Sequence, residues 1–157
     1  MEYNELESNI GYIFIEKNLL DRALTTKGYV NESKQQNPNS PPIQSQDAFC
    51  TLGDAVLKLI LVDYLIKYKG YNKSGEITEE KKQAEKRKTL AKISRQLNIG
   101  NFLKMGTGER EHNKIYDNDD NLAETLEAII GAIYLDIGFE ASKKIIMKWP
   151  EFERFIA

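Results

Sequence analysis

Apolar residues recur along the chain at intervals of three and four positions, and they almost nowhere alternate with polar ones. This spacing is typical of helices that each bury one face, and it predicts almost no strand. Gly70 and Pro150 are expected to end two of these helices, and Ser74 or Thr78 to cap the charged one. The predicted helices cover residues 6–14, 19–25, 47–69, 75–97, 121–135 and 140–149, with a short helical turn within 98–103.

Two segments lack this periodicity. Residues 31–46 contain three prolines among Asn, Gln and Ser, a composition that cannot bury enough apolar surface to fold alone and predicts a flexible surface loop. Residues 106–120 combine two glycines with seven charged residues and are also expected to form a loop. No internal repeat is present. We therefore expect one compact, multi-helix, all-α domain over residues 1–157.

The chain has 157 residues with 22 Lys and Arg against 24 Asp and Glu, a formal net charge of −2. Because an overall basic excess is missing, contact with a nucleic acid would have to come from local patches or from bound metal. The single cysteine cannot form an intramolecular disulfide or a C-x-x-C zinc site, which indicates a reducing, cytoplasmic compartment. The most apolar stretch, 52–66, contains three charged residues, so no membrane span is expected.

Acidic side chains are the candidate functional residues. In the helix over 47–69, Asp47, Cys50 and Asp54 follow one another at spacings of three and four and share one face. Gly53 leaves room beside Asp54 for another backbone or a ligand. Cys50 is read as a small buried residue, since nearby carboxylates would raise the pKa of its thiol.

A second acidic pair, Glu124 and Glu127, directly precedes an apolar run. Carboxylates that adjoin buried surface are costly unless a positive charge compensates them. A hard divalent cation, Mg²⁺ or Mn²⁺, suits such oxygen donors. The alternative is that these residues are ordinary solvated acids near helix starts.

The amino-acid sequence of both segments resembles that of the endonuclease domain of the ribonuclease III family. Residues 49–57, FCTLGDAVL, are similar to the family signature ERLEFLGDAVL, and residues 121–136, NLAETLEAIIGAIYLD, are similar to its second acidic helix. Further matches occur in the family's order over residues 6 to about 149. They are found at 10–14, 19–25, 75–78, 88–91 and 102–109.

The resemblance implies a divalent-metal-dependent endoribonuclease that cleaves double-stranded RNA as a homodimer. It implies catalytic roles for Asp54 and Glu127 and a metal site formed by Asp54, Glu124 and Glu127. Two family positions differ, because Cys50 stands where the family has Glu and Glu124 where it has Asp. The family also places at Thr51 an aromatic residue that wedges into the partner subunit, so the dimer contact is expected to differ here.

Two further family acidic positions, Asp47 and Glu76, would lie at the periphery of the cluster. For both, the favoured interpretation is a helix cap or a surface salt bridge.

The best candidate for phosphate contact is the charged helix over 76–97, with seven basic and four acidic residues. A solvated helix with internal salt bridges has a similar composition. The loop over 109–120 is acidic, unlike its family counterpart, which argues against RNA contact there; alternatively, its acids, Glu109 among them, could recruit cations near the site. The candidate RNA-binding residues are Lys81, Lys82, Lys86, Arg87 and Lys88.

No segment after Pro150 is long enough for the family's double-stranded RNA-binding domain. Affinity would then depend on the shape of the dimer or on a separate RNA-binding partner. The substitution at Cys50 and the acidic loop keep an alternative function open. In that alternative, the chain is a catalytically weakened or inactive module for RNA binding or ribonucleoprotein assembly.

Overall fold

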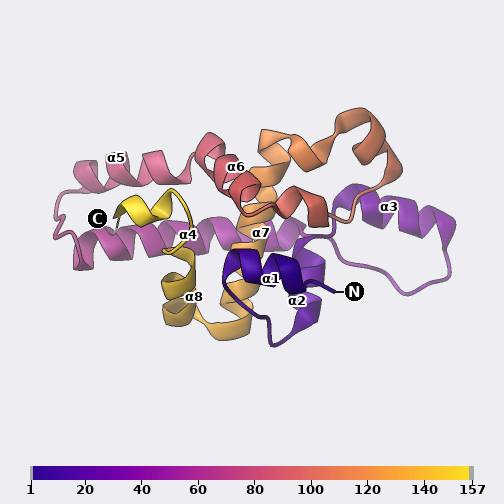
Figure 1. The fold of residues 1–157 in the computed structure, drawn as a ribbon, viewed down its shortest axis with the longest axis horizontal. Coiled ribbons are helices and arrows are strands. Elements are labelled where there is room, and N and C mark those ends of the chain that lie inside the picture. The colour runs from indigo at the N-terminus through magenta and orange to yellow at the C-terminus, as the bar shows by residue number, and fades with distance from the viewer. Residues whose placement is uncertain (1, 156–157) are drawn as a thin grey trace.

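The computed structural model describes residues 2–155, and within them the chain forms helices and no strand (Figure 1). The only extended pairing in this range is an isolated parallel bridge between Thr25 and Lys104. The all-α prediction is confirmed. The helices are α1 (Asn4–Ile10), α2 (Lys17–Ala23), α3 (Lys27–Gln36), α4 (Asp47–Lys67), α5 (Ser74–Glu85), α6 (Arg87–Gln96), α7 (Asp119–Ile137) and α8 (Phe139–Ile146). Single turns occupy Ile99–Phe102, Glu109–Asn113, Ile115–Asp117 and Phe152–Phe155.

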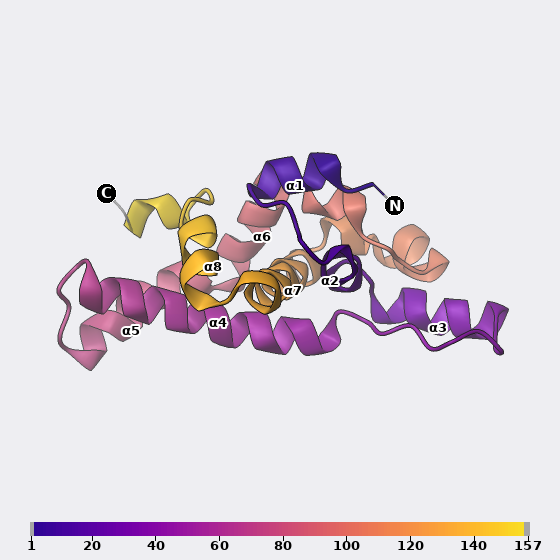
Figure 2. The same cartoon turned by 90° about the horizontal axis from the view of Figure 1, so that it is seen from below.

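Helix α7 runs through the centre of the fold and crosses the long helix α4 (Figures 1 and 2). Helices α2, α6 and α8 also contact α7, so it is surrounded by neighbours along most of its length. Its sequence fits that position, because the predicted apolar positions are all buried. They are Leu122, Leu126, Ile129, Ile130 and Ile133.

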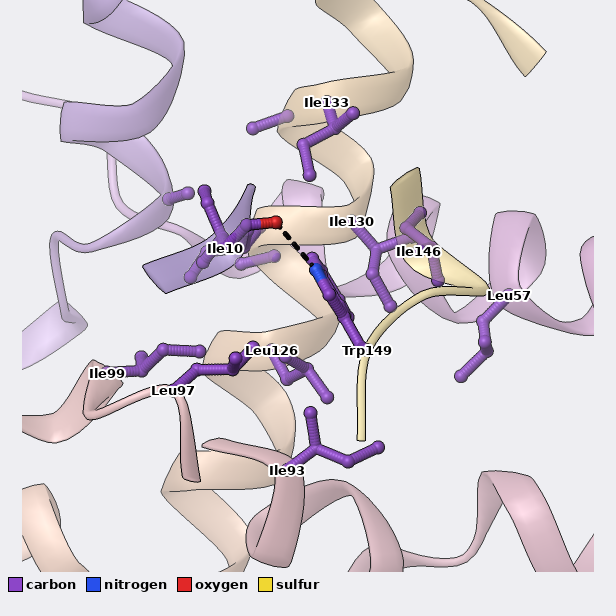
Figure 3. Close-up of a cluster of buried hydrophobic side chains, with 14 of the residues drawn as sticks. Ile10, Leu57, Ile93, Leu97, Ile99, Leu126, Ile130, Ile133, Ile146 and Trp149 are labelled. Carbon is purple, nitrogen blue, oxygen red and sulfur yellow. Dashed lines mark hydrogen bonds between the residues drawn. The ribbon is translucent and has the colours of Figure 1, made fainter. Parts of the chain in front are cut away.

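Both ends of the chain pack against this central helix. Ile10 of α1 and Trp149 lie beside Ile130 of α7, and the Trp149 Nε1 donates a hydrogen bond to the Ile10 carbonyl oxygen at 2.8 Å (Figure 3). A buried indole N–H normally requires such a partner. The contact therefore closes the core between residues 139 positions apart in the sequence.

The start of α4 is fixed by a buried polar contact. Gln46 lies directly before the helix, and its amide nitrogen donates to the Ala23 carbonyl oxygen at 2.7 Å and to the Thr125 hydroxyl at 3.3 Å. These bonds link α4 to α2 and α7, so the first turn of α4 has a defined position relative to α7.

The charged segment forms two helices, so the prediction of one helix over 75–97 is wrong. Lys86 takes an extended conformation, with ψ of 151°, between α5 and α6. Helix α5 contacts α4, whereas α6 contacts α7, and one straight helix could not follow both. The predicted caps are also wrong, because Ser74 is already helical and no side chain caps α5.

The predicted loop over 31–46 begins too early. Residues 31–36 belong to α3, which Thr26 caps by accepting a hydrogen bond from the Tyr29 amide. The prolines begin only at Pro38, after the helix has ended. The segment over 106–120 also holds two single turns, and α7 starts at Asp119.

Across residues 2–155, every helix is too short or too polar to serve as a membrane-spanning segment.

Candidate functional site

The two acidic helices touch through glycine. A Cβ atom added at Gly53 of α4 would lie 1.5 Å from the Glu127 carbonyl oxygen of α7, and one added at Gly131 would lie 2.6 Å from the Phe49 carbonyl oxygen. The space beside Asp54 is therefore filled by another backbone, one of the two occupants predicted for it. This close approach brings Asp54 and Glu127 together.

A cleft of about 530 Å³ opens over this contact. The three predicted metal-binding carboxylates, Cys50 and Asp47 all line it. Glu76 does not, and it is exposed in the first turn of α5. The lining residues are Thr26, Lys27, Gln46, Asp47, Cys50, Thr51, Asp54, Arg87, Glu109, Asn121, Glu124 and Glu127.

The side chains of Asp54 and Glu127 lie close enough to perturb each other's pKa. Burial, followed by the hydrogen bond and the charge of Asp54, raises the pKa of Glu127 to about 8. Burial also opposes the charge on Asp54, but hydrogen bonds from Lys58 and Glu127 outweigh it and lower the pKa of Asp54. The pair therefore shares a proton, as expected for two carboxylates that cannot both ionise cheaply.

Two cationic side chains compensate the carboxylates. The Lys58 Nζ lies 2.8 and 2.7 Å from the two carboxylate oxygens of Asp54. Arg87 approaches Glu124 at 3.6 Å, and Asp120 at the same distance. With the side chains held in this way, no three Asp, Glu, His or Cys residues in the described part of the chain are grouped closely enough to hold a metal ion.

The donor set nevertheless fits a hard divalent cation. Asp54, Glu124 and Glu127 bring an excess of carboxylates to one cleft, and burial, followed by the neighbouring Asp54, raises the pKa of Glu127. A cation such as Mg²⁺, which often takes only one or two protein carboxylates, would relieve that excess. The three-carboxylate metal set stays a prediction.

Cys50 contributes no oxygen donor. Its Sγ donates a hydrogen bond to the Glu124 carbonyl oxygen at 3.2 Å. Burial, with the charges of Glu124 and Glu127, raises the pKa of this thiol to about 12. Cys50 is therefore a neutral thiol, and soft sulfur is a poor partner for Mg²⁺.

Sequence reasoning missed Thr26 and Lys58, and it considered Glu109 only as one of the loop acids that could recruit cations near the site. Glu109 reaches the cleft from the acidic segment and accepts hydrogen bonds from the Thr26 hydroxyl and the Gly106 amide. Nothing local signals this role, because the contact joins segments 83 positions apart. Lys58 did carry a signal, since it lies four residues after Asp54 on the same helix.

The candidate RNA-binding residues lie in different environments. Lys81 is mostly buried and forms a 2.8 Å ion pair with Glu85, and Arg87 lies in the cleft. Lys82, Lys86 and Lys88 are exposed around the junction of α5 and α6. Only these last three present their ammonium groups on the outer surface.

Comparison with known proteins agrees with this fold. A family model described as ribonuclease-III-like matches residues 16–150. Ribonuclease 3 of Caldanaerobacter subterraneus is 34% identical over 142 residues, covering 90% of this chain and 59% of that protein. Ribonuclease 3 of Campylobacter jejuni is 35% identical over 147 residues, covering 94% and 60%.

Two solved structures of the nuclease domain of Campylobacter jejuni ribonuclease III are similar. One has a TM-score of 0.80 at 33% identity and covers 94% of each chain, and it is described as flexible in a region involved in dimer formation. The other has a TM-score of 0.78 at 34% identity and covers 92% of this chain and 90% of that one. The chain belongs to the ribonuclease III family. It spans about 59% of the length of the first curated relative.

Proposed function

We propose that the protein is a divalent-metal-dependent endoribonuclease that hydrolyses phosphodiester bonds in double-stranded RNA. The observation that carries this proposal is the meeting of Asp54 and Glu127 in one cleft at the α4–α7 crossing, where Gly53 lies against the backbone of Glu127. Membership of the ribonuclease III family supports the reaction class. We assign the activity to RNA processing in the cytoplasm, a compartment consistent with the free thiol of Cys50.

Asp54 and Glu127 would hold Mg²⁺, or Mn²⁺ in its place, and Glu124 would supply further negative charge. A divalent cation held there would supply charge that polarises the phosphate and would make a water molecule more acidic and so more nucleophilic. Glu127 must release its proton before its carboxylate oxygens can bind the metal. Arg87, which lies in the same cleft, can then orient a phosphate oxygen with its planar guanidinium group.

A homodimer is the second part of the proposal. Leu59 and Ile66 project from α4 with 55% and 50% of their surface exposed, although the opposite face of this helix is buried. Thr51 and Ala55 are also exposed and continue the same row at spacings of four. A second copy of the chain would cover this surface and place two clefts on one RNA, each cutting one strand.

RNA contact would extend from the cleft to Lys82, Lys86 and Lys88. These exposed ammonium groups suit the phosphate backbone of an A-form helix, which proteins recognise mainly by its shape. A separate RNA-binding protein could add affinity.

A cleavage assay on long double-stranded RNA, with Mg²⁺ and then with Mn²⁺, tests the reaction. We expect Asp54→Asn and Glu127→Gln each to lower the rate about 100-fold or more, because metal polarisation is worth several kcal/mol in the transition state. Glu5→Gln, at an exposed carboxylate of α1, is the matched control and should cleave like the wild type. Cleavage that persists in Asp54→Asn would assign the activity elsewhere.

Sedimentation velocity tests the dimer. The wild type should sediment as a dimer at micromolar concentration, and Leu59→Glu should shift it to monomer by burying a charge in the interface. A wild type that is only monomeric would contradict this part of the proposal.

A second function is favoured by one observation, the neutral Cys50 thiol in place of a family carboxylate. In this alternative the protein binds RNA, or assembles into a ribonucleoprotein, without cleaving it. Retention of RNA binding by a wild type that does not cleave with either metal would support this alternative over the nuclease.

A further inference from the structure

Lys58 blocks the carboxylate that the proposed metal would use. Its Nζ contacts both oxygens of Asp54, at 2.8 and 2.7 Å, so neither oxygen is left without a positive partner. A divalent cation can take an Asp54 oxygen only if at least one of these bonds breaks. The question is where the ammonium group goes.

A second acceptor is present on α5. The Glu85 Oε1 accepts a hydrogen bond from Lys81 at 2.8 Å, but its Oε2 is buried without a hydrogen-bond partner. No other side-chain nitrogen or oxygen in the described part of the chain is buried in this state. A buried carboxylate oxygen without a hydrogen-bond donor is costly. Glu85 Oε2 is therefore an available acceptor for a cationic side chain.

Lys58 and Glu85 lie on neighbouring helices. Helix α5 runs alongside the second half of α4 in both views (Figures 1 and 2). Lys58 has a flexible four-carbon stem and is about half exposed, so it can change rotamer without disturbing the core. The charge of Glu85 already contributes to raising the pKa of Lys58, after the hydrogen bond to Asp54.

We propose that Lys58 is a movable counter-ion. It neutralises Asp54 in the metal-free protein, and when a divalent cation binds, its side chain changes rotamer so that the ammonium group pairs with Glu85 Oε2 instead. This inference rests on the proposed metal centre. Lys58 is then a positioning residue, because it acts on the metal through Asp54 and stabilises the acidic cluster before metal arrives.

The first test measures Mn²⁺ affinity by electron paramagnetic resonance. Lys58→Met keeps the length of the side chain and removes the competing charge, so it should tighten Mn²⁺ binding on the order of tenfold. Lys67→Met is a closely matched control, because Lys67 pairs with Asp63 at the same spacing on the same helix, at 2.9 Å. It should bind Mn²⁺ like the wild type.

The second test separates movement from simple repulsion. Glu85→Gln removes the alternative acceptor, so displacement of Lys58 should become harder and Mn²⁺ binding weaker. The gain from Lys58→Met should then be larger in the Glu85→Gln background than in the wild type, by roughly threefold or more. If Lys58→Met increases Mn²⁺ affinity equally in both backgrounds, the Lys58 side chain does not move to Glu85, and the proposal is overturned.

A third measurement needs no change at Glu85. In protein with ¹³C-dimethylated lysines, the Lys58 resonance, assigned by its loss in Lys58→Met, should shift as Mg²⁺ saturates, while that of Lys67 stays fixed. A stationary Lys58 resonance would also overturn the proposal. Failure of the wild type to bind either metal would instead reject the metal centre itself, so the two failures are distinguishable.

Discussion

At the crossing of α4 and α7 two helix backbones touch at Gly53 and Gly131, whereas α3 buries none of its own residues. The arm formed by α3 and the loop over 37–46 projects from the body in both views (Figures 1 and 2). The crossing is held by close packing, and the arm by a few polar contacts to the acidic segment. Thr107, for example, donates its amide and hydroxyl to Glu32 of α3.

This contrast shows how the cleft combines two kinds of wall. Asp54, Glu124 and Glu127 stand on helices whose positions are fixed by contact between backbones. Thr26 and Glu109 reach the same cleft from segments that polar contacts hold. Groups that must hold a metal need the fixed wall, because small displacements of a ligand are costly.

The largest expected effect comes from breaking the crossing. Gly53→Ala would place a methyl group 1.5 Å from the Glu127 carbonyl oxygen, so the helices must separate. We expect a loss of about 3 kcal/mol or more in unfolding free energy, measured by urea denaturation. Gly75→Ala is the control, because a Cβ atom there meets nothing within 4 Å and alanine favours the helix. Similar stability of the two variants would disprove the backbone contact.

Hydrogen exchange compares the two regions directly. Amides in the buried middle of α7 should exchange only through global unfolding, whereas those of α3 should exchange through local opening, with protection lower by several kcal/mol. Mass spectrometry of exchanged peptides measures both in one sample. Equal protection of α3 and α7 would contradict the distinction between fixed crossing and loosely held arm.

A carboxylate introduced at position 50 of α4 tests the side of the cleft that the α4–α7 crossing holds in place. Cys50→Glu adds a longer side chain at a half-buried position and should cost ~1–3 kcal/mol in stability. It should also tighten Mg²⁺ binding, because Cys50 lines the cleft one helical turn before Asp54. Isothermal titration calorimetry measures this affinity. A folded variant with unchanged affinity would remove position 50 from the metal site.

The smallest effect is expected in the arm. Thr26→Ala removes the cap of α3 and the donor to Glu109, and should cost ~1 kcal/mol. The loss should appear as faster exchange in α3 and not in α7. If α7 exchanges faster as well, the arm and the crossing unfold as one unit.

The sequence predicted the central part of the fold well. The apolar spacing located α4 and α7 to within a few residues, and the acidic spacing with Gly53 indicated a close approach beside Asp54. These features follow from local rules, because the apolar face of a helix must be buried and only glycine permits contact between backbones. The break at Lys86 escaped prediction, because α5 and α6 pack on different helices.

The sequence by itself determined the helical class, the two long helices and the carboxylates that they carry. Only the tertiary structure decided which charges meet, because Arg87 reaches Glu124 and Glu109 reaches Thr26 across long intervals of chain. It also left Glu85 Oε2 buried without a partner on α5, the helix that packs against the α4 segment carrying Lys58. Burial and the approach of Asp54 set the pKa of Glu127, and both arise only when α4 and α7 pack together.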